Sequence, residues 1–295
     1  SVFGSDVRPI KAKSRTWWVV RVPATATPAE GRRSPIVLWL ESLGLLGKRS
    51  HEKRVPDIVF EQPREHVATF LRHLWSTDGT IIKGRSAPAI RYPTSSPGLA
   101  SDVQALLLRL GVLSTVRAVS QGSKGRTQHV VVVQGKADQV RFLEAVAPEH
   151  DPQAGEARLI LEHHAGRKAN TNLDVIPRSA WQVVVKPAMK RVGMTGRKLS
   201  RDIEMAYCGS SLYKSGIGRE RALRVAAACQ SDELARLATS DVYWDRVVSV
   251  EPDGEAETYD LTVPGPANFV AGDFVAHNSI EQDADLILLL YRQEY

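Results

Sequence analysis

The fold of this chain is decided by the stretch REHVATFLRHLWSTDGTI, which runs from Arg64 to Ile82. Apolar side chains recur in it at positions i, i+3, i+4, i+7 and i+8, the spacing of an amphipathic helix. They are Val67, Phe70, Leu71, Leu74 and Trp75. Gly79 predicts the end of this helix, so the carboxylate of Asp78 is expected in its last turn.

The segments that follow predict a regular order of elements. The stretch SSPGLASDVQALLLRLGVLSTVRAV predicts a second helix, from Leu99 to Leu110, and then a strand. TQHVVVVQG is rich in β-branched residues and predicts another strand. VRFLEAVAP, from Val140, has a helical pattern. The predicted order is helix, strands, helix, strand, strand, helix, which is an α+β fold.

An internal repeat extends this pattern toward the N-terminus. KSRTWWVV, from Lys13, is echoed by KGRTQHVV, from Lys124, and each is followed by an apolar helical stretch. If the repeat is complete, the counterpart of the Arg64 helix would lie before residue 1. The chain also begins with Ser1 and ends with Tyr295 inside an apolar, strand-like run. We therefore expect it to be a fragment of a longer protein.

The charge is distributed unevenly along the chain. Residues 1–150 hold 22 Lys and Arg against 12 Asp and Glu, and residues 151–240 hold 15 against 9. Residues 241–295 hold 2 against 12, so the acidic tail opposes a basic body. A basic body of this size indicates a polyanionic partner such as nucleic acid, although a solvated basic surface would give the same count.

Several protein classes are excluded or disfavoured by composition. Cys208 and Cys229 are too few for a disulfide scaffold and lack the spacing of a metal site. No apolar run reaches the roughly 18 residues of a membrane span, and no signal peptide is visible. We therefore expect a cytoplasmic protein without a membrane partner. The phosphate-binding motif G-x-x-x-x-G-K-[ST] is absent, so this chain by itself should not bind ATP.

Two further segments differ from this first part. Residues 151–240 predict short basic helices separated by glycines, either a DNA-binding module or a packing linker. From Val242 to Val275 the pattern predicts strands in VYWDRVVSVE, ETYDLTVPG and NFVAGDFVA, with turns at Asp253-Gly254 and Pro264-Gly265.

The tripeptide His277-Asn278-Ser279 can carry out self-cleavage. The amide nitrogen of Asn278 can attack its own backbone carbonyl, which forms a succinimide and breaks the bond to Ser279. A neighbouring histidine can supply the proton that the leaving amine needs, and the hydroxyl of Ser279 can accept an acyl group. An ordinary loop could contain the same tripeptide, so its surroundings decide the matter.

Those surroundings, TYDLTVPGPANFVAGDFVAHNS, resemble the C-terminal splicing motifs of inteins. The resemblance runs from about Val242 to Ser279. It implies that Asn278 cyclises with help from His277, that Ser279 begins the downstream host protein, and that Asp260 coordinates the two cleavages. No cofactor is implied for splicing. Many inteins carry histidine seven residues after the acid, where this chain has Ala267.

The stretch LRHLWSTDG, from Leu71 to Gly79, resembles the LAGLIDADG helix of homing endonucleases. The resemblance implies that Asp78 is catalytic, binds Mg²⁺ and acts on double-stranded DNA, whereas the upstream acid of the motif is replaced by Ser76. It also implies that basic residues of the strands contact DNA phosphates. The candidates at equivalent repeat positions are Lys13, Arg15, Lys124 and Arg126, although either lysine could instead be catalytic or simply solvated.

The last 17 residues, SIEQDADLILLLYRQEY, resemble a stretch of bacterial replicative DNA helicases of the DnaB type. This implies a host that is hexameric and uses ATP with Mg²⁺ only when complete. The missing N-terminal intein and helicase segments would be partners of this chain.

We therefore expect an α+β chain in four parts. Residues 1–150 form a LAGLIDADG-like endonuclease of the αββαββα repeat type, comprising the end of a first repeat plus a second repeat, and residues 151–240 form a basic helical module or linker. Residues 241–278 form the C-terminal part of a β-rich intein splicing domain, the Hint fold, and residues 279–295 begin the host helicase. Two alternatives remain: a DNA-binding module whose endonuclease has decayed, and a processing domain that cleaves without ligation, against which Ser279 argues.

Overall fold

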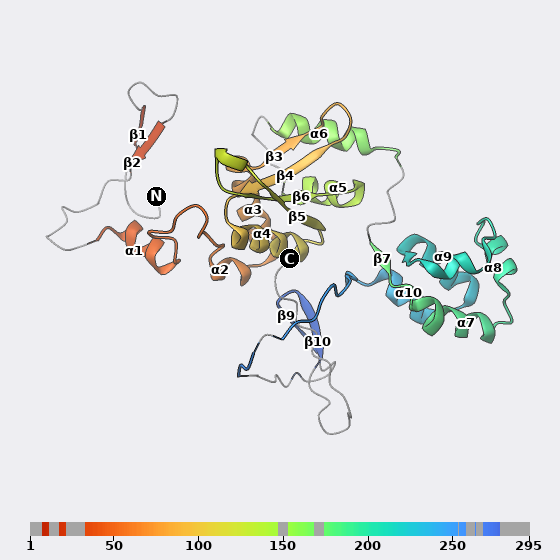
Figure 1. The fold of residues 1–295 in the computed structure, drawn as a ribbon. Coiled ribbons are helices and arrows are strands. Elements are labelled where there is room, and N and C mark those ends of the chain that lie inside the picture. The colour runs from red at the N-terminus through yellow and green to blue at the C-terminus, as the bar shows by residue number, and fades with distance from the viewer. Residues whose placement is uncertain are drawn as a thin grey trace. The chain divides into compact units, whose positions relative to one another are not determined.

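The structure is a computed structural model, and it describes residues 8–11, 18–21, 33–146, 153–167, 174–252, 254–257, 263 and 268–277. The chain divides into two compact units, of which the first contains Ser1–Gln134 and Asp138–His164 and the second contains Ala165–Tyr291. Each unit has its own buried core among the described residues. The mixed α+β class is confirmed, and the elements are shown in Figure 1.

The first unit is built on a four-stranded antiparallel sheet. Helix α3 (Arg64–Asp78) leads into β3 (Thr80–Ile82) and β4 (Ala89–Thr94), and α4 (Pro97–Arg109) leads into β5 (Ser114–Val119) and β6 (Gln128–Val133). Helix α5 (Lys136–Ala145) closes the series, so the predicted αββαββα order is confirmed. The strand order is β3-β4-β6-β5, which places one strand of each hairpin at the centre of the sheet.

Side chains point alternately to the two faces of the sheet, and the apolar ones bury one of these faces. Ile81, Ile90 and Val133 stand opposite one another on β3, β4 and β6, and all three are buried. Beneath this face lies an aromatic cluster, in which the ring centroid of Trp75 is 5.3 Å from that of Tyr92 and 4.7 Å from that of Phe142. The core forms because period-2 strands and the 3.6-residue stripe of α3 present apolar side chains to each other.

Helix α3 ends at Asp78 as expected, but for a different reason. A glycine that ends a helix commonly adopts a left-handed conformation, whereas Gly79 has an ordinary extended backbone with φ −77° and ψ 165°. A Cβ at this position would lie 2.3 Å from Cδ1 of Trp75 and 2.7 Å from its Cα. Glycine is therefore required here because the backbone passes directly over the buried indole.

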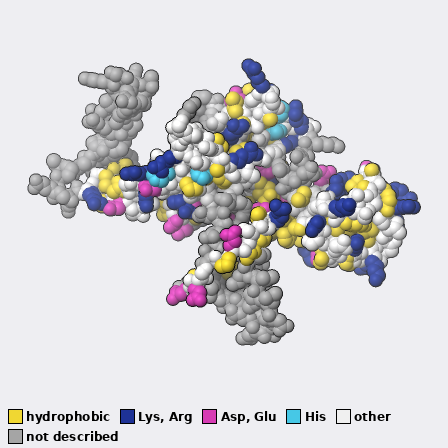
Figure 2. Space-filling model, in the orientation of Figure 1, with side chains coloured by type: hydrophobic (Ala, Val, Ile, Leu, Met, Phe, Trp, Pro, Cys, Tyr) yellow, Lys and Arg dark blue, Asp and Glu magenta, His cyan; other side chains and the backbone are white. Residues whose placement is uncertain are grey.

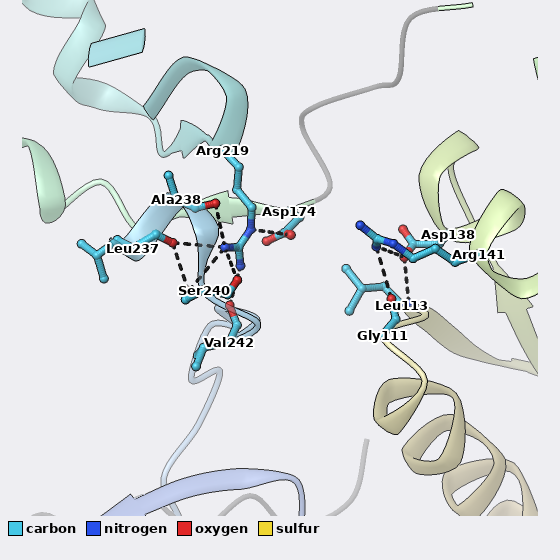
Figure 3. A network of polar contacts seen from close by, with 10 residues as sticks. All are labelled: Gly111, Leu113, Asp138, Arg141, Asp174, Arg219, Leu237, Ala238, Ser240 and Val242. Carbon is cyan, nitrogen blue, oxygen red and sulfur yellow. Dashed lines mark hydrogen bonds and ion pairs between the residues drawn. The ribbon is translucent and has the colours of Figure 1, made fainter. Parts of the chain in front are cut away.

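Buried carboxylates fix the loops of the first unit. Asp102 on α4 accepts hydrogen bonds from Arg54 Nε (2.8 Å), Arg54 Nη2 (2.7 Å) and the backbone nitrogen of Val55 (2.9 Å). Asp138 on α5 accepts from the backbone nitrogen of Leu113 at 3.0 Å and pairs with Arg141, as Figure 3 shows. These contacts hold the segment before α3 and the turn after α4 in place.

The first unit extends further than the sequence analysis placed it. The predicted boundary was residue 150, yet α6 (Gln153–His164) contributes Ala157 and Ile160 to the same core as the sheet. Glu156 of α6 also accepts a 2.6 Å hydrogen bond from the backbone nitrogen of Lys83, just beyond β3. The short apolar stripe of α6 thus completes the sheet unit, and the boundary falls after His164.

Upstream of α3, the described residues form a hairpin and two helices. Strands β1 (Arg8–Lys11) and β2 (Trp18–Arg21) pair antiparallel, with Arg8 opposite Arg21. Helix α1 (Pro35–Ser42) follows, and then α2 (Asp57–Phe60). A hairpin followed by a helix therefore occurs twice, as β1-β2-α1 and as β5-β6-α5, at the positions of the repeat seen in the sequence.

The second unit contains a helical module around Trp181. Its helical elements are the π-helix η2 (Trp181–Val185), α7 (Lys186–Arg191), α8 (Gly196–Asp202), the 3₁₀ helix η3 (Gly209–Lys214), α9 (Arg219–Cys229) and α10 (Asp232–Thr239). A short ladder joins β7 (Val175–Ile176) to β8 (Ile217–Gly218). Trp181, Leu199, Val225 and Leu234 are buried in the shared core. Ser231 caps α10 by accepting from the backbone nitrogen of Leu234.

The β-rich segment after the helical module is confirmed only in its last hairpin. Strands β9 (Asn268–Ala271) and β10 (Phe274–His277) pair antiparallel through Gly272 and Asp273, both with positive φ. This is the two-residue hairpin turn that NFVAGDFVA favours. The strand predicted in VYWDRVVSVE was wrong, because residues 242–252 pair with no strand among the described residues and alternation cannot replace a hydrogen-bonded partner. The predicted turn at Pro264-Gly265 lies outside the described residues.

Candidate functional site

Asp78 occupies the end of α3 at the start of the sheet. Its side chain is exposed, and the last turn of the helix contains no basic residue. The carboxylate therefore sits at the negative end of the helix dipole without local compensation, which is unfavourable for an anion and favours a nearby cation. Asp78 directly precedes Gly79, whose carbonyl accepts a hydrogen bond from Gln153 Nε2 at 3.2 Å.

The phenol of Tyr92 lies in the electrostatic field of this carboxylate. Burial first, and then the negative charge of Asp78, raise the pKa of Tyr92 to about 12. The phenol of Tyr92 therefore stays protonated and uncharged near the exposed carboxylate of Asp78 at neutral pH.

The sheet presents a second, exposed face opposite the core. On it Thr80, Arg91, Val132 and Thr115 stand in one row across the four strands, and Pro93, Val130 and Arg117 stand in the next. Arg91 and Arg117 are exposed, and neither forms an ion pair within the described part of the chain. A face with two exposed guanidinium groups that form no ion pair among the described residues, flanked by a carboxylate, has the character of a surface that binds phosphates.

Sequence reasoning missed Arg91 and Arg117. The signal was present, because AIRYPT and STVRAV each place arginine at a position that alternates with apolar residues. Only the register between the strands brings the two arginines to the same face, and register cannot be read from either strand alone.

The predicted DNA-binding residues divide into two groups. Arg126 is exposed in the loop between β5 and β6, and the backbone of Lys124 ends the 3₁₀ helix η1 (Gly122–Lys124) in the same loop. Lys13 and Arg15, the candidates from the other repeat, lie outside the described residues. The structure therefore brings Lys124 and Arg126 together on one hairpin loop and leaves the other pair unplaced.

The predicted splicing residues lie at the edge of what the structure describes. The backbone of His277 ends strand β10, opposite Asn268. Asn278, Ser279 and Asp260 lie outside the described residues. Asn278 directly follows the last residue of a hairpin whose register is set by its turn.

A magnesium site would require more oxygen ligands than Asp78 provides. Within the described ranges, no group of three or more His, Cys, Asp or Glu side chains is placed to hold a metal ion. Ser76, at the position of the upstream acid, donates its hydroxyl to the carbonyl of Arg72 at 2.9 Å. Asp78 alone therefore fits one ligand position of such a site and no more.

In the described parts of the chain, no helix has the length and apolar character needed to cross a membrane.

Comparison with known proteins identifies relatives for the whole chain. A family model described as a LAGLIDADG-like domain matches residues 65–147. The replicative DNA helicase DnaB of Synechocystis sp. is 45% identical over 298 residues, which cover 100% of this chain and 34% of that protein. The DnaB helicase of Rhodothermus marinus is 48% identical over 296 residues, covering 99% of this chain and 32% of that protein.

A relative of another kind is the RecA protein of Mycobacterium tuberculosis, 24% identical over 279 residues, or 88% of this chain and 35% of that protein. The chain spans about a third of the length of the DnaB relatives that it matches. The αββαββα unit that ends its first helix in Asp78 coincides with the LAGLIDADG-like match. The chain is therefore similar over nearly its whole length to part of DnaB-type replicative DNA helicases, and residues 65–147 match a LAGLIDADG-like domain.

Proposed function

We propose that this chain is an intein with a homing endonuclease domain, inserted in a replicative DNA helicase of the DnaB type. One observation carries the proposal: nearly the whole chain aligns with about a third of DnaB helicases and, more distantly, with about a third of a RecA protein. A segment shared by differently named host proteins has the character of a mobile insert. In this proposal ATP and Mg²⁺ use, hexamer assembly and action in the cytoplasm belong to the complete helicase.

The proposed splicing chemistry uses four residues near the seam. The Asn278 side-chain nitrogen attacks the Asn278 carbonyl carbon, a C–N bond forms to give the succinimide, and the peptide bond to Ser279 breaks. His277 donates a hydrogen bond or proton to this step, so that the Ser279 nitrogen leaves as an amine. The Ser279 hydroxyl accepts the upstream acyl group beforehand. Asp260 coordinates the two cleavages. Ala267 cannot donate a proton, so His277 or water would have to supply it during cyclisation of Asn278.

The β9–β10 hairpin supports this assignment. Its two-residue turn fixes the pairing of His277 with Asn268, so the chain enters Asn278 from a defined backbone position. Cyclisation needs a particular geometry of side chain and backbone, and a hairpin end restricts that geometry more than a free loop does.

The test of splicing is the release of the segment that begins at Ser279. The chain is expressed with its upstream sequence restored, and the products are weighed by mass spectrometry. Asn278→Ala should abolish C-terminal cleavage because the attacking amide is gone, whereas Asn268→Ala, in the same hairpin, should leave it in place. Undiminished cleavage in Asn278→Ala would refute the assignment.

The first unit is proposed to act on double-stranded DNA as a hydrolase of phosphodiester bonds. Asp78 would supply one carboxylate to Mg²⁺, whose chemistry when bound is to activate water and stabilise the leaving oxygen. Arg91, Arg117, Lys124 and Arg126 would hold phosphates on the exposed face of the sheet and its hairpin loop, and Lys13 and Arg15 would do so in the other repeat. The second acid of the site would come from the partner LAGLIDADG helix upstream.

A second candidate, a DNA-binding module with a decayed endonuclease, is favoured by one observation. Ser76 replaces an acid and is hydrogen-bonded to its own helix, and Asp78 is in no group of three potential ligands among the described residues. Cleavage of DNA in Mg²⁺ by the protein with its upstream part restored distinguishes the two candidates.

A further inference from the structure

The helical module carries a run of positive charge that the proposed function does not use. From Lys186 to Arg201 the sequence KPAMKRVGMTGRKLSR contains six basic residues and no acid. All six are exposed in the structure. We name them the α7–α8 basic surface: Lys186, Lys190, Arg191, Arg197, Lys198 and Arg201.

The local fold explains why these side chains are turned outward. Met189 of α7 and Leu199 of α8 are buried in the module's core. Between the helices, Gly193 adopts φ +63°, and the backbone nitrogen of Met194 bonds to the carbonyl of Met189 at 2.8 Å. Thr195 then caps α8 by accepting from the backbone nitrogen of Lys198. The two short helices are thus locked by their apolar sides, which leaves the basic sides in solvent.

Few of these charges are neutralised by the protein itself. Arg201 lies 3.8 Å from the carboxylate of Asp202, and Arg191 donates to the carbonyl of Gln230 at 2.8 Å. Lys186, Lys190, Arg197 and Lys198 form no ion pair within the described part of the chain. Figure 2 shows Lys and Arg side chains spread over this module with few Asp or Glu between them. Like charges on two consecutive helices repel one another, and a polyanion relieves that repulsion.

Two aromatic side chains accompany the basic residues. Tyr207 is 56% exposed, and the guanidinium carbon of Arg197 lies 5.6 Å from its ring centroid. Lys186 Nζ lies 4.8 Å from the ring centroid of Tyr213. Stacking on a ring limits the rotamers of a long cationic side chain, so a partner that binds it loses less conformational entropy. A merely solvated surface has no need of such ordering.

We propose that the α7–α8 basic surface is a second DNA-binding site, which contacts the phosphates of duplex DNA outside the sheet's own contact. The inference rests on the proposed endonuclease function, since that function requires duplex DNA to be held. The α7–α8 basic surface contacts backbone phosphates. Its lysines bind anionic oxygens through one ammonium group, and its arginines can donate two parallel hydrogen bonds. An acidic protein partner would be recognised by the same charges, so the test uses duplex DNA itself.

The test compares two triple variants of the whole chain with equal loss of charge. One is Lys190→Gln, Arg197→Gln and Lys198→Gln on the basic surface. The matched control is Arg178→Gln, Arg236→Gln and Arg246→Gln, three exposed residues of the same unit outside that surface. Affinity for a duplex of several helical turns is measured against salt concentration by fluorescence anisotropy, with circular dichroism to confirm folding.

Each phosphate contact contributes about 0.9 to the slope of log affinity against log salt. The basic-surface triple should therefore reduce the slope by about 2.7, and the control should change it by much less. If both triple variants reduce the slope equally, the proposal of a second DNA-binding site is wrong, although the chain still binds DNA. If the unaltered chain does not bind duplex DNA even at low salt, the DNA-binding part of the proposed function fails as well.

Discussion

Loss of the Arg219 side chain should destabilise the second unit, because it makes several polar contacts there. Its guanidinium donates to Asp174 Oδ2 at 2.6 Å and to the carbonyls of Leu237 (3.1 Å), Ala238 (3.3 Å) and Ser240 (2.7 Å). It also donates to the carbonyl of Val242. As Figure 3 shows, one side chain thus joins Asp174, which directly precedes β7, to the end of α10 and to the chain that leaves the helical module.

The expected cost of Arg219→Ala follows from these contacts. The carbonyls at the end of α10 have no helical partner and depend on a donor such as this one. Hydrogen bonds to a charged group are worth about 1.5–3 kcal/mol each, and removing one partner of a buried pair costs about 3–5 kcal/mol. Because the Asp174 side chain is 35% exposed and water can replace part of the interaction, we expect a loss of about 3 kcal/mol.

Hydrogen exchange read by mass spectrometry is the assay, because it measures opening energies segment by segment. Arg219→Ala should lower protection in α9 and α10 and leave α3, β4 and β6 unchanged. The matched control is Arg224→Ala on the same helix, whose Nη1 makes a single 3.1 Å bond to the carbonyl of Ile203. Because the Arg224 side chain is exposed and water can replace that bond, its loss should cost only about 1 kcal/mol. Equal loss of protection in α3 and α9 would show that the two cores are not independent.

Two further predictions concern the region of Asp78. Asp78→Asn should abolish Mg²⁺-dependent DNA cleavage by the protein with its upstream part restored and leave splicing intact, since Asn278 lies in a different unit; equal loss of both activities in a folded variant would contradict the division. The raised pKa of Tyr92 keeps its stabilising contribution complete below the ordinary value of 10.0 and removes it as pH rises to about 12. In Tyr92→Phe, the free energy of unfolding from urea titrations should therefore fall less between pH 10.0 and about pH 12 than in the unaltered protein. The same pH dependence in both proteins would disprove the assignment.

The first unit shows how far sequence patterns reach. The apolar stripe of α3, the helical patterns from Leu99 and Val140 and the β-branched run in β6 predicted the αββαββα order together, because each is a local property of its own segment. The role of Gly79 was not predictable, since its close approach to Trp75 depends on the tertiary path of the chain. The place of α6 was missed because a stripe of only two buried apolar residues, Ala157 and Ile160, does not reveal which core it joins.

The candidate site shows the same division between local and nonlocal information. Asp78 was found because its position at a helix end is a local property. Arg91 and Arg117 were not found, since 25 residues, helix α4 among them, separate the two arginines in the sequence and only the fold brings their strands into one sheet. The strand predicted in VYWDRVVSVE failed for the opposite reason: its alternation is local, whereas a strand needs a partner.

The strand order of the first unit has a consequence for aggregation. Sheets end in edge strands whose unpaired backbone groups can recruit a second chain. Here β3 is only three residues long and packs against α6, with the Lys83 nitrogen already bonded to Glu156. The opposite edge, β5, has six residues and carries the exposed charge of Arg117 near its middle. One edge is thus covered and the other charged, so the arginine that we propose for phosphate binding also discourages sheet-to-sheet association between copies of the protein.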